Sequence, residues 1–132
     1  MLEFFVRKRP FIDEFLEQMS RVYEVVFFSS ASEEYTNKLL DRIDSNRVAV
    51  ARLFKDSCEL NPEGVYEKPI AKLGRSLKHT VLLDNTPEAF ARNKENAIPV
   101  CGWFGDEKDE ELMNLIPILN KLSQVKDVRL VI

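Results

Sequence analysis

The chain has 132 residues, a formal net charge of −3, and a composition of 45% hydrophobic and 31% charged residues. This length supports one hydrophobic core but not two, so we expect a single domain over residues 1–132. The composition excludes a low-complexity chain, the weak negative charge gives no reason to expect direct nucleic-acid binding, and no apolar run approaches the roughly 18 residues of a membrane span.

Cysteine and basic residues give little indication of function. Cys58 and Cys101 have neither the spacing nor the partners of a zinc or redox motif, so we interpret them as reduced packing residues in an intracellular, reducing compartment. The basic cluster Arg7-Lys8-Arg9 is interpreted as a solvated strand end.

The first half of the chain alternates strand and helix patterns. Pro10 suits the first turn of a helix, the continuous apolar run EVVFFSS is typical of a strand covered on both faces, and Ser30 with Glu33 fits a capping box. These patterns predict strands at 2–6 and 24–30 and helices at 9–23 and 32–44.

The second half continues the alternation. We expect Pro117 to kink the last helix, whose buried face should consist of Leu112, Leu115, Ile116, Leu119 and Leu122. The expected elements are a strand with irregular chain at 48–60, a turn at 61–64, strands at 80–84 and 97–101, a helix at about 107–123, and a closing edge strand at 127–132. The whole pattern predicts an α/β fold, with a parallel sheet covered by helices on both faces.

Polar residues follow two of the expected strands. Ser29 and Ser30 end one strand, and Asp84 and Asn85 end another, where α/β proteins bind ligands. A hydroxyl could hold a phosphoryl oxygen, a carboxylate could hold Mg²⁺, and Lys68 could neutralise a phosphoryl group. Local sequence also allows simpler roles: the serines as helix caps, Lys68 as a surface lysine, and Asp84 in an ordinary turn.

Blocks of sequence spread over nearly the whole chain resemble a known family. They are KRPFIDEFLEQM, YEVVFFSSASEEY, LFKDSC, EKPIAKLGRSL, VLLDNTPEAF, ENAIPVCGWFGD and DVRLVI. In their order and spacing they are similar to the catalytic domain of the small C-terminal-domain phosphatases. That family is also called the nuclear LIM interactor-interacting factor family, within the haloacid dehalogenase superfamily.

The resemblance implies a Rossmann-like parallel sheet and magnesium-dependent dephosphorylation of phosphoserine or phosphothreonine in a protein or peptide, notably the tail of RNA polymerase II. Ser29 matches the hydroxyl that bonds the phosphoryl group, and Lys68 matches the lysine that steadies the phosphoaspartate. Asp84 matches the magnesium ligand, with Asn85 as the supporting asparagine.

Three aromatic positions also match the family. Tyr35 corresponds to an aromatic residue of the substrate groove, but its neighbour Ser32 stands where the family commonly has an apolar residue. This departure puts recognition of the polymerase tail in doubt. Trp103 and Phe104 match a Trp-Phe pair that we interpret as packing rather than catalytic.

The family's first motif, Asp-x-Asp-x-Thr, does not occur in these 132 residues. The first catalytic strand, which lies between the strands ending in Ser29 and Asp84, is therefore absent, and we expect the chain alone to be inactive for want of the nucleophile and general acid. The explanations are an incomplete sequence that begins at an internal methionine, a naturally shortened binding domain, or a separate polypeptide that supplies the strand.

The alternative function is a non-catalytic binding module such as the receptor subunit of the mitochondrial presequence translocase. The chain resembles that branch in the sequence FSS and in its ending, LIPxLxxL…KDVR. The phosphatase branch would place the protein in the nucleus or cytoplasm, and the receptor branch would place it in the mitochondrion.

Overall fold

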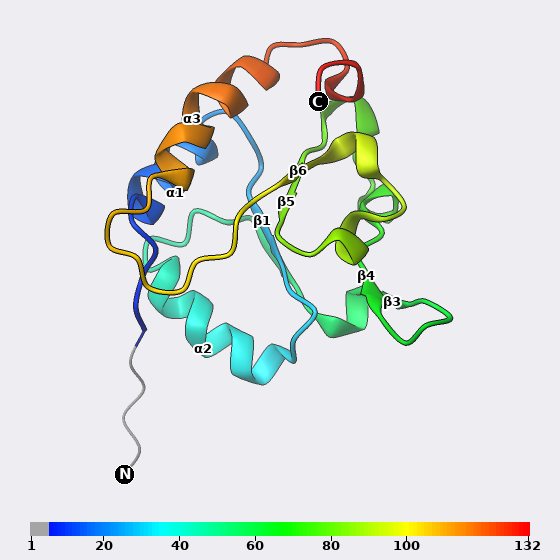
Figure 1. Cartoon of the computed structure of the whole chain (residues 1–132), viewed down its shortest axis with the longest axis horizontal. Coiled ribbons are helices and arrows are strands. Elements are labelled where there is room, and N and C mark those ends of the chain that lie inside the picture. Colours follow the sequence, from blue (N-terminus) through cyan, green and yellow to red (C-terminus); the bar gives the residue numbers. More distant parts are fainter. Residues whose placement is uncertain (1–5) are drawn as a thin grey trace.

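The computed structural model describes residues 6–132 and has a mixed α/β fold (Figure 1). The strand expected at 2–6 lies outside the described residues except for Val6, which is irregular. The elements are α1 (Ile12–Ser20), β1 (Val26–Phe28), α2 (Glu33–Ile43), β2 (Ala51–Leu53), β3 (Glu59–Leu60), β4 (Tyr66–Glu67), β5 (Leu82–Asp84), β6 (Ala97–Pro99) and α3 (Glu111–Leu122).

The strands form three separate two-stranded ladders. β1 pairs in parallel with β2, β5 pairs in parallel with β6, and β3 pairs antiparallel with β4. The predicted parallel pairing is therefore confirmed. Within residues 6–132 no strand joins the β1–β2 ladder to the β5–β6 ladder, as the expected absence of the first strand implies.

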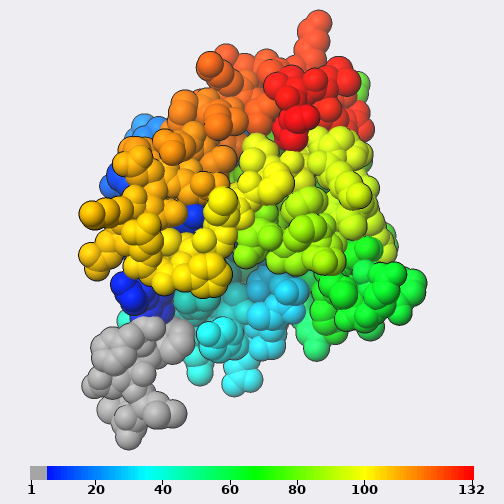
Figure 2. Space-filling model, viewed as in Figure 1, coloured from blue at the N-terminus to red at the C-terminus, as the bar shows by residue number. Residues whose placement is uncertain are grey.

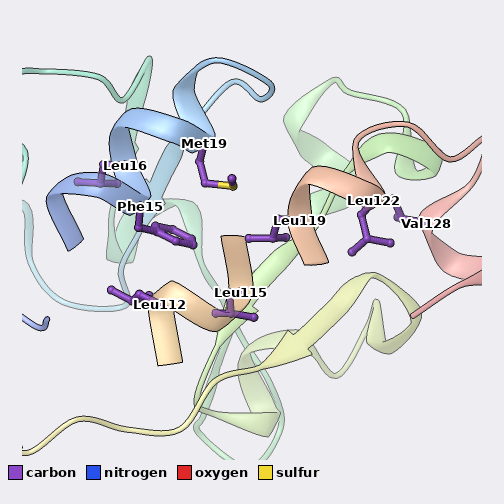
Figure 3. Packing of buried hydrophobic residues seen from close by; sticks show 8 residues of the cluster. All are labelled: Phe15, Leu16, Met19, Leu112, Leu115, Leu119, Leu122 and Val128. Atoms are coloured by element: carbon purple, nitrogen blue, oxygen red, sulfur yellow. The ribbon is translucent and has the colours of Figure 1, made fainter. Parts of the chain in front are cut away.

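The hydrophobic core lies between α1 and α3. Figure 3 shows Phe15 and Met19 of α1 facing the leucines of α3. Burying such side chains contributes roughly 1.5–3 kcal/mol each. The predicted buried face of α3 is confirmed at Leu112, Leu115, Leu119 and Leu122, while Ile116 is half-buried.

The same core covers one face of both parallel ladders. Phe27 of β1, Leu83 of β5 and Ile98 of β6 all pack against the α1–α3 cluster. The two ladders therefore share one covered face. The expectation that the 24–30 strand is covered on both faces is wrong, since Val26 is 37% exposed.

Both early helices begin later than predicted. α1 starts at Ile12 because Phe11 before it has a left-handed backbone with φ of 69°. The prediction of a capping box formed by Ser30 and Glu33 is wrong. The N-cap of α2 is Ser32, and its side chain makes no capping hydrogen bond. Ser29 Oγ instead accepts a hydrogen bond from Ala31 N–H at 3.1 Å, which makes the strand end a local turn.

The closing edge strand is also wrong. Residues Val128–Leu130 form a short 3₁₀ turn, because the Asp127 carboxylate accepts hydrogen bonds from the backbone N–H and the guanidinium of Arg129. Val128 is only 1% exposed and joins the α1–α3 core. The C-terminal segment is thus fastened by a side-chain turn and one buried valine.

None of the helices found in residues 6–132 combines the length and the apolar character needed to cross a membrane.

Candidate functional site

A pocket of about 510 Å³ lies where β1 and β5 end. It brings together the strand-end residues predicted from the sequence: Ser29 and Ser30 after β1, and Asp84 and Asn85 at the end of β5, with Lys68 beside them. The remaining lining residues are Arg9, Phe28, Leu83, Thr86, Val100, Cys101, Gly102, Trp103 and Leu112.

Lys68 and Asp84 form an ion pair inside this pocket. Lys68 Nζ donates to Asp84 Oδ2, and the two side chains are 10% and 9% exposed. Asp84 Oδ1 also accepts from Thr86 N–H at 3.0 Å. Lys68 Nζ lies 5.8 Å from the centroid of the Phe28 ring, so the ammonium is held between the ends of β5 and β1.

Ser29 is fixed by its backbone. Its N–H donates to Leu53 C=O of β2 at 2.9 Å, and its C=O accepts a weak hydrogen bond from Cys58 Sγ at 3.8 Å. Burial raises the pKa of the Cys58 thiol, so the thiol stays protonated as a donor. Among the described residues, the Ser29 hydroxyl accepts from Ala31 N–H and donates to no protein group, so its proton is available to a ligand.

Arg9 also lines the pocket, although no sequence pattern predicted it as a site residue. Its guanidinium donates to both carboxylate oxygens of Asp109, at 2.7 and 3.1 Å, and to Cys101 C=O at 2.8 Å. The hydrogen-bonded Asp109 carboxylate raises the pKa of Arg9, and Arg9 lowers the pKa of Asp109. The interpretation of Arg9 as a solvated residue is therefore wrong, because its side chain is only 15% exposed.

The predicted packing role of the Trp-Phe pair is half correct. Trp103 is half-buried, lines the pocket, and donates from Nε1 to Asp106 C=O at 2.7 Å. Phe104 is 97% exposed and packs in no core. The cysteines are both free, but Cys101 is exposed rather than packed.

The two residues assigned to a substrate groove lie beside the pocket and do not line it. Ser32 is the N-cap of α2 and Tyr35, in the first turn of that helix, is 60% exposed. Because Ser30 lines the pocket, α2 begins close to the pocket mouth.

The donor set fits Mg²⁺ as part of a shared site. Asp84 offers a carboxylate and Asn85 an amide oxygen, the hard oxygen ligands that Mg²⁺ prefers. Both Asp84 oxygens already have protein partners, and residues 6–132 contain no group of three or more His, Cys, Asp or Glu side chains that could hold a metal. Further oxygen ligands would have to come from water, from a phosphate, or from another carboxylate.

Among the partners that residues 6–132 provide, β1 and β5 are each paired along one edge only. Val25 C=O accepts a hydrogen bond from Val50 N–H, just before β2, and Ser29 N–H donates to Leu53 C=O of β2. By strand alternation the backbone groups of Val26 and Phe28 therefore face away from β2. On β5, Asp84 C=O accepts a hydrogen bond from Val100 N–H, which directly follows β6. The backbone groups of Leu83 therefore face away from β6. We call the space between these two edges the strand slot.

These features define a mixed α/β protein with a pocket of charged and polar side chains at the ends of its parallel strands. The structure of Fcp1, an essential RNA polymerase II CTD phosphatase, has the same fold: the TM-score is 0.76 at 14% sequence identity, with 96% of this chain and 54% of that chain covered. The chain belongs to the NLI interacting factor-like phosphatase family, whose model matches residues 1–129.

Curated relatives agree with this membership. CTD small phosphatase-like protein 2 of Dictyostelium discoideum is 46% identical over 125 residues, which are 95% of this chain and 22% of the relative. Carboxy-terminal domain RNA polymerase II polypeptide A small phosphatase 2 of Homo sapiens is 44% identical over 124 residues, 94% of this chain and 45% of the relative. The chain thus spans less than half the length of these relatives.

Proposed function

We propose that this chain carries the phosphate-binding part of a magnesium-dependent serine/threonine phosphoprotein phosphatase and does not catalyse turnover by itself. The observation that supports this most directly is that Ser29, Lys68 and Asp84 line one pocket between β1 and β5. A small anion with several acceptor oxygens matches the donors of the first two residues, which are the Ser29 hydroxyl and the Lys68 ammonium.

Each residue would have a distinct task. The Ser29 hydroxyl donates to a phosphoryl oxygen, and Lys68 neutralises the charge that the phosphoryl group carries. Asp84 holds Lys68 in place and would hold Mg²⁺, which would offset the negative charge of the phosphoryl oxygens when bound. Asn85 supports that position with an amide oxygen.

The missing chemistry concerns the nucleophile. No Asp-x-Asp occurs in the 132 residues, so no pair of carboxylates is present to attack phosphorus and to protonate the leaving hydroxyl. We propose that an extended segment carrying Asp-x-Asp-x-Thr occupies the strand slot, in parallel with β1 and β5. Such a strand would end at the pocket, because parallel strands end at the same edge of a sheet.

A binding module without catalysis is the second candidate. It is favoured by the absence of Asp-x-Asp together with an intact anion pocket, which would let the domain hold a phosphorylated segment without hydrolysing it. In this case filling the strand slot would stabilise the domain but would produce no phosphate.

Anion binding and turnover separate these functions. We expect a phosphoserine peptide and inorganic phosphate to change the fluorescence of Trp103, the single tryptophan, because it lines the pocket. Ser29→Ala and Lys68→Met should each weaken this binding about tenfold or more, whereas Lys72→Met, outside the pocket, should not. Circular dichroism checks that each variant is folded.

Phosphate release is then measured with Mg²⁺, with and without a synthetic apolar strand that ends in Asp-x-Asp-x-Thr. The phosphatase hypothesis expects release only when the strand is added. Release by the chain alone would contradict the proposed inactivity, and unchanged phosphate affinity in folded Ser29→Ala and Lys68→Met would show that the pocket is not the anion site.

A further inference from the structure

Phe104 is unusual for its exposure and its position. At 97% it is the most exposed large apolar side chain among residues 6–132. Single exposed apolar residues are common and need no explanation by themselves. Phe104, however, directly follows Trp103, which lines the candidate phosphate pocket, so the exposed ring lies at the rim of a binding site.

The ring has a defined place on that rim. A methyl group built on Gly102 would lie 3.3 Å from two carbons of the Phe104 ring and 3.5 Å from Asn85 Nδ2. The aromatic ring and the Asn85 amide therefore approach the same point above Gly102. Since Asn85 lines the pocket, a peptide whose phosphate enters the pocket would carry a neighbouring residue past the ring.

The loop that carries Phe104 is fastened at several points. We call residues 101–109 the rim loop. Arg9 holds it at Cys101 C=O and at the Asp109 carboxylate, and Arg7 Nη2 donates to Gly105 C=O at 3.3 Å. Gly105 has a φ of 102°, a left-handed conformation that favours glycine. In the space-filling view, dark blue atoms of the N-terminal segment show among the yellow and orange atoms of this region (Figure 2).

This fastening lowers the cost of using Phe104 in binding. A residue on a fixed loop loses less conformational freedom on binding than one on a free loop, so more of its contact energy appears as affinity. Exposed aromatic side chains are also the usual anchors of binding surfaces.

We propose that Phe104 is a specificity residue: its ring docks an apolar side chain adjacent to the phosphorylated residue of a bound phosphopeptide. This inference rests on the proposed function of the pocket and adds the class of peptide selected. Phe104 makes no contact with the phosphate, and the contribution of Arg7 and Arg9 to this preference is to position the rim loop.

The test compares two phosphoserine peptides of equal length, with leucine or with glycine on both sides of the phosphoserine. Affinity for the 132-residue chain is measured by fluorescence anisotropy of labelled peptides. We expect the leucine peptide to bind about 3- to 10-fold more tightly, from the energy of one docked apolar side chain on an aromatic ring. Phe104→Ala should abolish the preference without changing the affinity for the glycine peptide.

Phe104→Tyr should retain the preference, and Leu130→Ala is the matched control, because Leu130 is 85% exposed and does not line the pocket. The proposal is overturned if wild type shows no preference or if Phe104→Ala keeps it. Unphosphorylated peptides separate the two hypotheses. Equal binding with and without phosphate would refute the phosphate pocket while leaving a Phe104-dependent leucine preference standing. Failure of every peptide to bind would refute both.

Discussion

The ion pair of Lys68 and Asp84 allows a quantitative prediction about stability. Removing one partner of a buried pair leaves an uncompensated charge and typically costs about 3–5 kcal/mol. Both side chains are about nine-tenths buried, so most of that penalty should apply. Asp84 would keep its hydrogen bond from Thr86 N–H, and we therefore expect Lys68→Met to cost about 3 kcal/mol, near the lower end of the range.

The second single variant, Asp84→Leu, forms a double-mutant cycle with Lys68→Met. It leaves the Lys68 ammonium over the Phe28 ring, which compensates only in part, so we expect a similar loss of about 3 kcal/mol. In the double variant neither charge remains, and the loss should be smaller than the sum of the two by about 2 kcal/mol or more.

Urea unfolding followed by tryptophan fluorescence and by far-UV circular dichroism gives these free energies, provided that the two probes coincide. Lys72→Met is the matched control, because the Lys72–Glu59 pair is exposed, with Lys72 at 68%. Such pairs contribute at most about 1 kcal/mol. Additive losses in the double variant, or equal losses for Lys68→Met and Lys72→Met, would refute a buried, coupled pair.

Two further predictions concern parts of the chain outside the pocket. Pro117 lies exposed within α3 and cannot donate the helical hydrogen bond, so Pro117→Ala should stabilise the protein by about 1–3 kcal/mol; an unchanged or lower urea midpoint would contradict this. The hydrogen-bonded Arg129 side chain lowers the pKa of Asp127 from 3.8 to about 2. Its contribution to stability is therefore complete above about pH 4 and is lost as the pH falls toward 2, so the stability difference between wild type and Asp127→Asn should shrink over that interval; a constant difference would exclude the ion pair as its source.

The strand-end residues could be predicted because the rule that selects them is local. Ser29 and Asp84 each follow a short apolar run, and the carboxyl ends of parallel strands meet at one edge. No such rule selects Arg9, whose partner Asp109 lies 100 residues further along the chain. Contacts at that separation depend on the packing of α1 against α3, which periodicity does not reveal.

The fold was predictable to a similar extent. The alternation of strands and helices gave the α/β class, and the spacing of leucines gave the buried face of α3. The absence of the first strand implied a gap between the strands that end in Ser29 and Asp84, and the separate β1–β2 and β5–β6 ladders agree with it. The last segment was missed for another reason: its apolar β-branched residues suit a strand, but the Asp127–Arg129 side-chain contact stabilises a turn instead.

The open edges of β1 and β5 have a consequence for handling the protein. Natural sheets protect their outer strands with charges, prolines or bulges, which keep neighbouring molecules from pairing with them. β1 reads Val-Phe-Phe and carries none of these, and β5 has only Asp84 at its end. Two copies of the domain could therefore satisfy one another's amide and carbonyl groups, and we expect self-association at high concentration to compete with any strand that would enter between the ladders.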